Sequence, residues 1–155
     1  MTTFDLVIQN GTVVTATKQI DCDIGISQGK IHTLGHDLGA RETIDADGKL
    51  VLPGGIDSHC HIEQLSSFGI VCADDFYTGT VSAAFGGTTT IIPFAAQHRG
   101  QSLKKVVSDY HKRARSKAVV DYAFHMIISD PGETVMGEEL TELIRQGCTS
   151  FKVYM

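Results

Sequence analysis

Hydrophobic and polar positions alternate with a period of two through the first fifty residues, in short runs that are separated by turn residues. This pattern is typical of strands that bury one face, and the pair Asn10-Gly11 is a strong signal for a two-residue hairpin turn. We therefore predict a hairpin at the start of the chain and interpret residues 1–50 as a small antiparallel β segment. The predicted strands span residues 4–9, 12–15, 21–26 and 30–34.

After residue 50, strand-like and helix-like patterns alternate, with repeats of about thirty residues. The apolar run Leu50-Val51-Leu52-Pro53 predicts the start of the first buried strand, which ends at His59 and His61. Later strands are predicted over residues 88–94, 119–128 and 148–155. Helices are predicted over residues 75–85 and 102–116, with a third that ends at Gly147. Such alternation predicts parallel strands joined by crossover helices.

The predicted fold class is therefore α/β, with a β segment over residues 1–50 and a barrel part over residues 51–155. Four strands and three helices make about half of a (β/α)8 barrel, which typically needs about 250 residues. The chain also stops on a strand without a helix to cover it, so we expect an incomplete barrel. A flavodoxin-like open sheet is the alternative, although its phosphate-binding glycine loop is not evident in this sequence.

Composition narrows the function classes. The chain has 155 residues, 42% of them hydrophobic, with a net charge of −5, as is ordinary for a globular protein. Its 13 basic residues are outnumbered by 18 acidic ones and form no block, which argues against a nucleic-acid partner. No apolar run approaches the roughly 18 residues that span a bilayer, and the first residues do not resemble a signal peptide. We expect a cytoplasmic protein with reduced cysteines and no membrane partner.

Two histidines at the end of the first predicted barrel strand are candidate metal ligands. Side chains alternate faces in an extended chain, so His59 and His61 point to the same side and Cys60 to the other. Two imidazoles on one face can bind one metal ion between them. The alternative is a pair of solvated loop histidines. Asp57 shares the face of the pair and could support it.

Lys152 and Tyr154 share a face of the last predicted strand, and lysine is seldom buried without a partner. Burial generally disfavours the ammonium form of lysine. A neutral amine reacts with carbon dioxide to give a carbamate, whose oxygens can bridge two metal ions. The alternatives are a lysine at the strand end that reaches water, and a tyrosine that packs in the barrel core.

Four segments resemble the hydantoinase/dihydropyrimidinase branch of the amidohydrolase superfamily, in its N-terminal part. Their order and spacing match that branch along nearly the whole chain. The resemblance implies a composite β-sandwich joined to a distorted (β/α)8 barrel that binds two zinc ions. The segments are Pro53–His61, Ala73–Thr80, Gly86–Ile92 and Thr149–Met155.

The resemblance also implies roles for the candidate residues. His59 and His61 would bind the more buried zinc ion, and carboxylated Lys152 would bridge both ions. A hydroxide between the metals would open the cyclic amide of a hydantoin, dihydropyrimidine or related imide, while Tyr154 binds the substrate and donates to the oxyanion. The family places further histidines and an aspartate after the lysine, so we expect the 155-residue chain to be inactive alone. Homo-oligomers, usually tetramers, are common in the family.

Other candidates have two interpretations each. Leu65 and Phe68 either shape the substrate pocket, as the loop at Glu63–Val71 does in the family, or pack that loop. Asp74 and Asp75 are interpreted as helix-start residues rather than a catalytic pair. His125 is interpreted as a hydrogen-bonded core histidine rather than a ligand. Two alternative functions also remain, namely a non-catalytic scaffold protein of the same fold, and an allantoinase or dihydroorotase.

Overall fold

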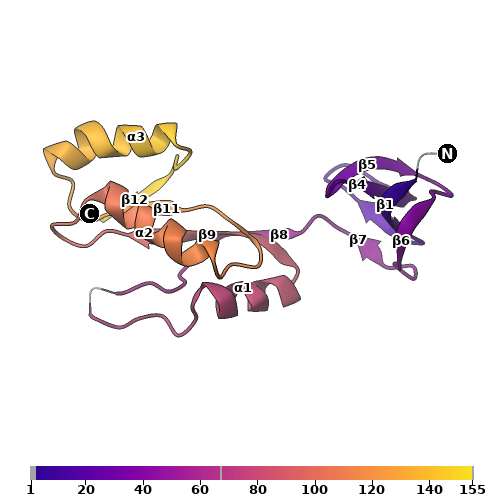
Figure 1. Cartoon of the computed structure of the whole chain (residues 1–155), viewed down its shortest axis with the longest axis horizontal. Helices are drawn as coiled ribbons and strands as arrows, with labels where there is room; N and C mark the ends of the chain where they lie inside the picture. Colours follow the sequence, from indigo (N-terminus) through magenta and orange to yellow (C-terminus); the bar gives the residue numbers. More distant parts are fainter. Residues whose placement is uncertain (1–2, 67, 155) are drawn as a thin grey trace. The chain divides into compact units, whose positions relative to one another are not determined.

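The computed structural model describes residues 3–66 and 68–154, and contacts within the chain divide it between Pro53 and Gly54 into two compact units (Figure 1). The first unit therefore extends slightly beyond residue 50, where the change in sequence pattern begins. Each unit has its own strands and its own buried cluster, so each is described by itself.

The first unit is a small β-sandwich of two sheets. One sheet has the order β5-β4-β1-β6 and the other the order β3-β2-β7. Val13 of the second sheet packs with Cys22 and Ile24 in the buried cluster that joins the two sheets. The strands are β1 (Phe4–Gln9), β2 (Thr12–Val14), β3 (Gln19–Asp21), β4 (Asp23–Ser27), β5 (Lys30–Gly35), β6 (Ala40–Asp45) and β7 (Leu50–Val51).

The predicted hairpin of residues 4–9 and 12–15 is wrong, because β1 and β2 lie in different sheets. β1 pairs in parallel with β6, and β2 pairs in parallel with β7, so the unit is not purely antiparallel. Asn10 does adopt the left-handed conformation of a turn residue, with φ 58°, and its Nδ2 donates to Asp45 Oδ1 at 3.0 Å. Asn10 and Gly11 thus form the turn that the sequence predicts. The partner of each flanking strand is decided instead by which of its faces is buried against the core.

The apolar run at residues 50–53 is also not the start of the histidine strand. Leu50 and Val51 form β7 beside β2, and the side chains of Leu50 and Leu52 are exposed. The histidine strand is instead β8 (Gly55–Cys60), which begins after Pro53. Hydrophobicity alone could not separate a strand of the first unit from the first strand of the second.

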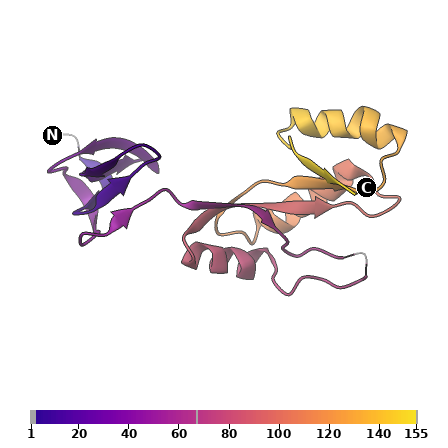
Figure 2. The ribbon, with the colours of Figure 1, turned by 180° about the vertical axis from the view of Figure 1, so that it is seen from behind.

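The second unit is a curled parallel sheet that forms half of a (β/α)8 barrel (Figure 2). β8 pairs with β9, β9 with β11, and β11 with β12, all in parallel, while the short β10 also pairs with β9. The predicted third strand is thus split into two pieces, and Met155 lies outside the described residues. The elements after β8 are α1 (Phe76–Phe85), β9 (Thr88–Ala96), α2 (Leu103–Arg115), β10 (Asp121–Tyr122), β11 (His125–Ile128), the π-helix η1 (Val135–Glu139), α3 (Leu140–Arg145) and β12 (Phe151–Val153).

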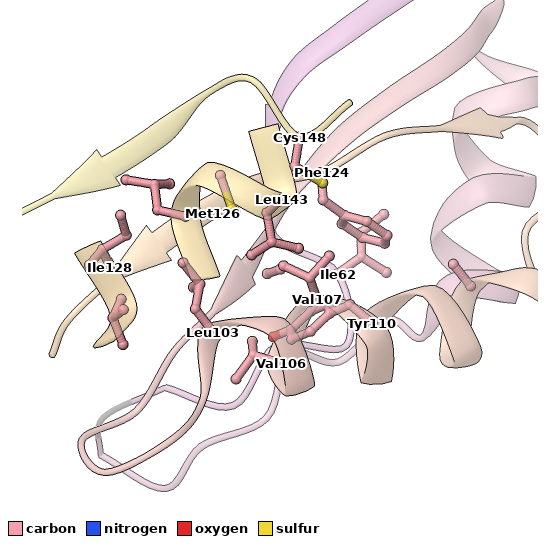
Figure 3. Packing of buried hydrophobic residues seen from close by; sticks show 14 of the residues in the cluster. Ile62, Leu103, Val106, Val107, Tyr110, Phe124, Met126, Ile128, Leu143 and Cys148 are labelled. Atoms are coloured by element: carbon pink, nitrogen blue, oxygen red, sulfur yellow. The ribbon is translucent and has the colours of Figure 1, made fainter. Parts of the chain in front are cut away.

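Apolar side chains fill the space between this sheet and its helices (Figure 3). Leu103, Val107 and Tyr110 come from one face of α2, as helical spacing in the sequence predicts, and they are buried in the same cluster as Met126 of β11. A smaller cluster on the opposite side of the sheet consists of Phe94, Ala96 and Ile127. Strand residues therefore alternate between the helices and the barrel interior, and the candidate site lies on the interior side.

Candidate functional site

The two histidines lie at the carboxyl end of β8 and face the same side. The ring centroids of His59 and His61 are 5.6 Å apart, and the rings meet edge to face at 69°. Both side chains are exposed. Asp57 accepts a hydrogen bond from the backbone N–H of His59 at 3.0 Å, so it supports the strand end rather than an imidazole ring. The alternation of side chains along β8 thus brings the pair together as predicted.

Phe94 lies at the centre of the site. This side chain is only 5% exposed, and its ring centroid is 4.8 Å from that of His59 and 5.0 Å from that of His61. The His125 ring is 5.1 Å away, and Lys152 Nζ lies 5.0 Å from the same Phe94 centroid. One aromatic ring on β9 therefore packs with chemically active side chains from β8, β11 and β12.

Lys152 occupies the middle of β12, where it pairs with Ile127 of β11 and is half-buried. Its Nζ also lies 5.4 Å from the ring centroid of Tyr154, so the ammonium has aromatic rings on two sides. His59 and Lys152 line one pocket of about 540 Å³ together with Phe94 and His125. His59 from the first strand of the half-barrel and Lys152 from its last strand thus share one pocket.

Tyr154 follows β12 and is 65% exposed. It lines a second pocket of about 340 Å³ that is also lined by Leu65, Gln64 and Gln97. Phe68, the other residue proposed from the loop, is 89% exposed. Of the two loop candidates, Leu65 is the one that the structure places in a pocket with Tyr154.

His125 is hydrogen-bonded through both ring nitrogens, as predicted, but it is half-buried and lines the pocket instead of lying in the core. Its Nε2 lies 2.9 Å from the carbonyl oxygen of Ser58, and its Nδ1 lies 2.5 Å from Ser150 Oγ. A carbonyl only accepts, so Nε2 carries the hydrogen and Nδ1 accepts from the serine hydroxyl. Both ring nitrogens are occupied, which leaves no lone pair for a metal ion.

The bond to Ser58 coincides with an irregularity in the sheet. Pro93 lies inside the central strand β9 and has no N–H for the ladder. The pairing of β8 with β9 shifts its register between Asp57 and Cys60, next to the pair Cys60–Pro93. A proline inside a sheet is expected at such a bulge. The carbonyl of Ser58, within the shifted stretch, accepts from the His125 ring.

The imidazole pair offers two donors of a type that binds metal ions, which is only part of a ligand set. Zinc sites in proteins generally use three or four protein donors, such as histidine nitrogens and carboxylate oxygens. Within residues 3–66 and 68–154, no group of three histidine, cysteine, aspartate or glutamate side chains is placed to hold a metal ion. An unmodified lysine ammonium has no lone pair to give. His59 and His61 can therefore bind a metal, provided that further donors complete the site.

Comparisons with known proteins identify relatives of this chain. The chain is 48% identical over 151 residues to D-hydantoinase of Geobacillus stearothermophilus, covering 96% of this chain and 32% of that protein. A solved D-hydantoinase structure superposes with a TM-score of 0.93 at 48% identity, covering 98% of this chain and 33% of that chain. The chain therefore matches the N-terminal part of proteins of the hydantoinase/dihydropyrimidinase family.

The structure of dihydropyrimidinase from Brevibacillus agri NCHU1002 is also similar to this chain, with a TM-score of 0.88 at 44% identity, covering 96% of this chain and 32% of that chain. The chain thus spans about one third of the length of these relatives. A scan against protein-family profiles gives no match. Among the described residues, no helix is long and apolar enough to cross a lipid bilayer.

The aspartate pair lies at the start of helix α1, as predicted, with the cap at Asp75. Its Oδ1 accepts from the backbone N–H groups of Tyr77 and Thr78, both at 2.9 Å. The bond from Thr78, with smaller contributions from Lys117, holds the pKa of the Asp75 carboxyl below its usual range. Asp74 Oδ1 accepts from the Thr78 hydroxyl at 2.9 Å. Both carboxylates are therefore occupied by helix capping.

Three residues of the site escaped the sequence analysis, namely Phe94, Gln64 and Gln97. Phe94 could have been found from the alternation of β9, because it follows Ile91 at an odd spacing and so faces the barrel interior. No comparable signal marks the glutamines. Gln64 lies 2.7 Å from the His61 ring, and Gln97 is 2% exposed and hydrogen-bonds backbone groups of two loops.

Proposed function

We propose that this chain provides one half of the metal site of a cyclic amidohydrolase, which opens the C–N bond of a hydantoin, a dihydropyrimidine or a related cyclic imide. The observation that carries the proposal is the grouping of His59, His61 and Lys152 around Phe94. Relatives that share 48% identity and a TM-score of 0.93 with this chain are named D-hydantoinase, which supports the same substrate class.

In the proposed site, His59 and His61 hold one zinc ion and carboxylated Lys152 bridges it to a second. Bound zinc lowers the pKa of water to about 7, which supplies a nucleophile at neutral pH. The fold of the protein fixes where the metal-binding side chains lie. His59 and His61 come from one strand end, and Lys152 comes from the far strand of the half-barrel, so the sheet sets the separation between the ligands.

The rings of Phe94 and Tyr154 lie 5.0 and 5.4 Å from Lys152 Nζ, within the range of a cation–π contact. Carboxylation would exchange these contacts for bonds between the carbamate oxygens and the metal ions. We therefore propose that carboxylation and metal binding occur together.

Tyr154 is proposed to bind the substrate and to donate its phenolic hydrogen to the developing oxyanion. Its exposed side chain lies beyond the last pairing residue of β12 and lines a pocket with Leu65. Loss of one such donor typically raises the barrier by about 2.7 to 4 kcal/mol. The apolar side chain of Leu65 in the same pocket suits the non-reacting part of a ring substrate.

Metal analysis of the complete protein, as wild type and as Lys152→Ala, tests the proposal. We expect bound zinc in the wild type, its loss in Lys152→Ala, and partial recovery of zinc when short carboxylic acids replace the carbamate oxygens. Lys49→Ala is the control, because Lys49 pairs with Asp47 on the surface of the first unit and should keep full zinc content. Wild-type zinc content in Lys152→Ala would disprove the bridging role.

A panel of ring-opening assays then separates the related functions. We expect the complete protein to hydrolyse hydantoins or dihydrouracil, and its activity on dihydroorotate or allantoin alone would reject the hydantoinase assignment. The non-catalytic scaffold alternative requires a wild-type protein without bound zinc. The homotetramer and the cytoplasmic location remain predictions, which sedimentation equilibrium and cell fractionation would check.

A further inference from the structure

The chain bends at Glu63, between His61 and Gln64, and the glutamine side chain contacts the histidine ring. His61 Nδ1 lies 2.7 Å from Gln64 Oε1. An amide oxygen only accepts hydrogen bonds, so Nδ1 carries the hydrogen and the lone pair of the neutral ring is left on Nε2. The hydrogen bond thus fixes both the ring orientation and which nitrogen can bind a metal ion.

The bend lies at Glu63, whose backbone is held in an unfavourable conformation. Its φ of 48° lies in the left-handed region, which residues with a Cβ rarely adopt. A conformation of this kind persists only where surrounding contacts enforce it. Contacts with other residues must therefore hold Glu63 in this conformation.

Those contacts reach Glu63 from the start of α1 and from the region of the α2 terminus. Its N–H donates to the carbonyl oxygen of Asp74 at 2.9 Å, and its own carbonyl accepts from Arg113 Nη1 at 3.1 Å. Its carboxylate accepts from Lys117 Nζ at 2.9 Å and from the N–H of Phe76 at 3.3 Å. The backbone and the side chain of Glu63 are thus both fixed to the helical layer.

The Gln64 backbone is fixed as well. Its carbonyl accepts from the N–H of Cys72 at 3.0 Å, and an antiparallel bridge between Leu65 and Val71 follows at once. The side chain of Gln64 therefore starts from a rigid base, half-buried, and points to His61. A flexible surface glutamine would not hold an imidazole in one orientation.

We infer that Gln64 is a positioning residue for His61, and that Glu63 holds Gln64 in place from the helical layer. Histidines that bind metals generally donate their other N–H to a carbonyl or carboxylate, and loss of that partner typically costs 10–100-fold in metal affinity. The inference rests on the proposed function only where it treats His61 as a metal ligand. The hydrogen bond that sets the tautomer does not depend on the metal.

Nitrogen-15 NMR of His61 in metal-free protein tests the hydrogen bond directly. At about pH 8.5, where imidazole side chains are neutral, we expect the Nδ1–H tautomer in the wild type. Gln64→Leu keeps the approximate size but removes the acceptor, so the Nε2–H tautomer should gain. Gln64→Glu keeps an acceptor and should restore Nδ1–H. Gln146→Leu is the control, because the exposed Gln146 side chain, at the C-terminal cap of α3, donates to Glu142 Oε1, and its replacement should leave His61 unchanged.

Zinc affinity, measured by competition with a chromogenic chelator, provides the second readout. Gln64→Leu should weaken binding about 10–100-fold, whereas Gln64→Glu should bind at least as tightly as the wild type. An unchanged tautomer in Gln64→Leu, or a Gln64→Glu protein that behaves like Gln64→Leu, overturns the inference. A wild-type protein that has the Nδ1–H tautomer but binds no zinc overturns the proposed function and supports the hydrogen bond.

Two variants of Glu63 test its role separately. Glu63→Ala removes the carboxylate but leaves a Cβ on the left-handed backbone, so the turn should relax and the His61 tautomer should shift although Gln64 is intact. Glu63→Gly removes the same carboxylate without the conformational penalty and should shift the tautomer less. If Glu63→Ala leaves the tautomer as in the wild type, Glu63 does not hold Gln64.

Discussion

Replacement of Gln97 by leucine should detach the loops that follow β9 and β11. The side chain of Gln97 is 2% exposed at the end of β9. Its Oε1 accepts from the backbone N–H groups of Ser129 at 3.0 Å and Asp130 at 3.1 Å, and its Nε2 donates to the carbonyl oxygen of Gln101 at 2.8 Å. One buried amide therefore satisfies backbone groups on both loops.

The expected loss follows from these three hydrogen bonds. Each contributes about 0.5–1.5 kcal/mol net, and a donor left buried without a partner costs about 1–3 kcal/mol. Leucine would fill the space but satisfy none of the three groups. Ser129 is exposed, so water can reach its N–H group, and the cost of leaving this group without a partner lies at the lower end of the range. We expect Gln97→Leu to lower the free energy of unfolding of the second unit by about 2–4 kcal/mol.

Urea unfolding followed by tyrosine fluorescence measures this quantity in the second unit alone. The chain has four tyrosines and no tryptophan, and every tyrosine lies after residue 53. Amide exchange at Ser129 and Asp130 should accelerate in the same variant. Gln146→Leu, at an exposed glutamine, should change the unfolding free energy by no more than about 0.5 kcal/mol. A loss below about 1 kcal/mol in Gln97→Leu, or unchanged exchange at both amides, would refute the reasoning.

Two further predictions concern β8. Gly54→Ala should lower the unfolding free energy of the second unit by about 1–3 kcal/mol, because the new Cβ would lie 2.1 Å from Thr89 Oγ1. Gly55→Ala is the control and should be tolerated, because its nearest contact would be at 3.4 Å. Equal urea midpoints for the two variants would contradict this prediction. Burial, with the charge of Asp57, raises the pKa of the Cys60 thiol to about 11. Alkylation of Cys60 by iodoacetamide should therefore be slow at about pH 8 and accelerate toward about pH 11. Rapid modification at about pH 8 in mass spectra would contradict this prediction.

Local signals in the sequence predicted the helices and the direction of the histidines. Ser102 accepts from the N–H of Lys105 at the start of α2, and Gly86 ends α1, both as predicted. The pair His59 and His61 faces one side because alternation in a strand depends only on neighbouring residues. Features of this kind are encoded within a few positions of the chain.

Features that depend on distant partners were not predicted. The sequence could not show that β1 would pair with β6 rather than with β2, because the choice depends on which faces bury the core. Nor could it show that Gln64 would turn back to His61, since contacts from Arg113 and Lys117 hold the intervening turn. These contacts join positions about fifty residues apart, as with Arg113 and the Glu63 carbonyl at a separation of 50.

The proline inside β9 has a consequence for how this sequence can vary. Pro93 gives no hydrogen to the ladder, the neighbouring strand shifts its register, and the ring of His125 donates to the carbonyl of Ser58 in the shifted stretch. Substitutions at Pro93 and His125 should therefore show epistasis, since a residue with an N–H at position 93 changes the need for the donor at position 125. In a mutational library, the two positions should be varied jointly.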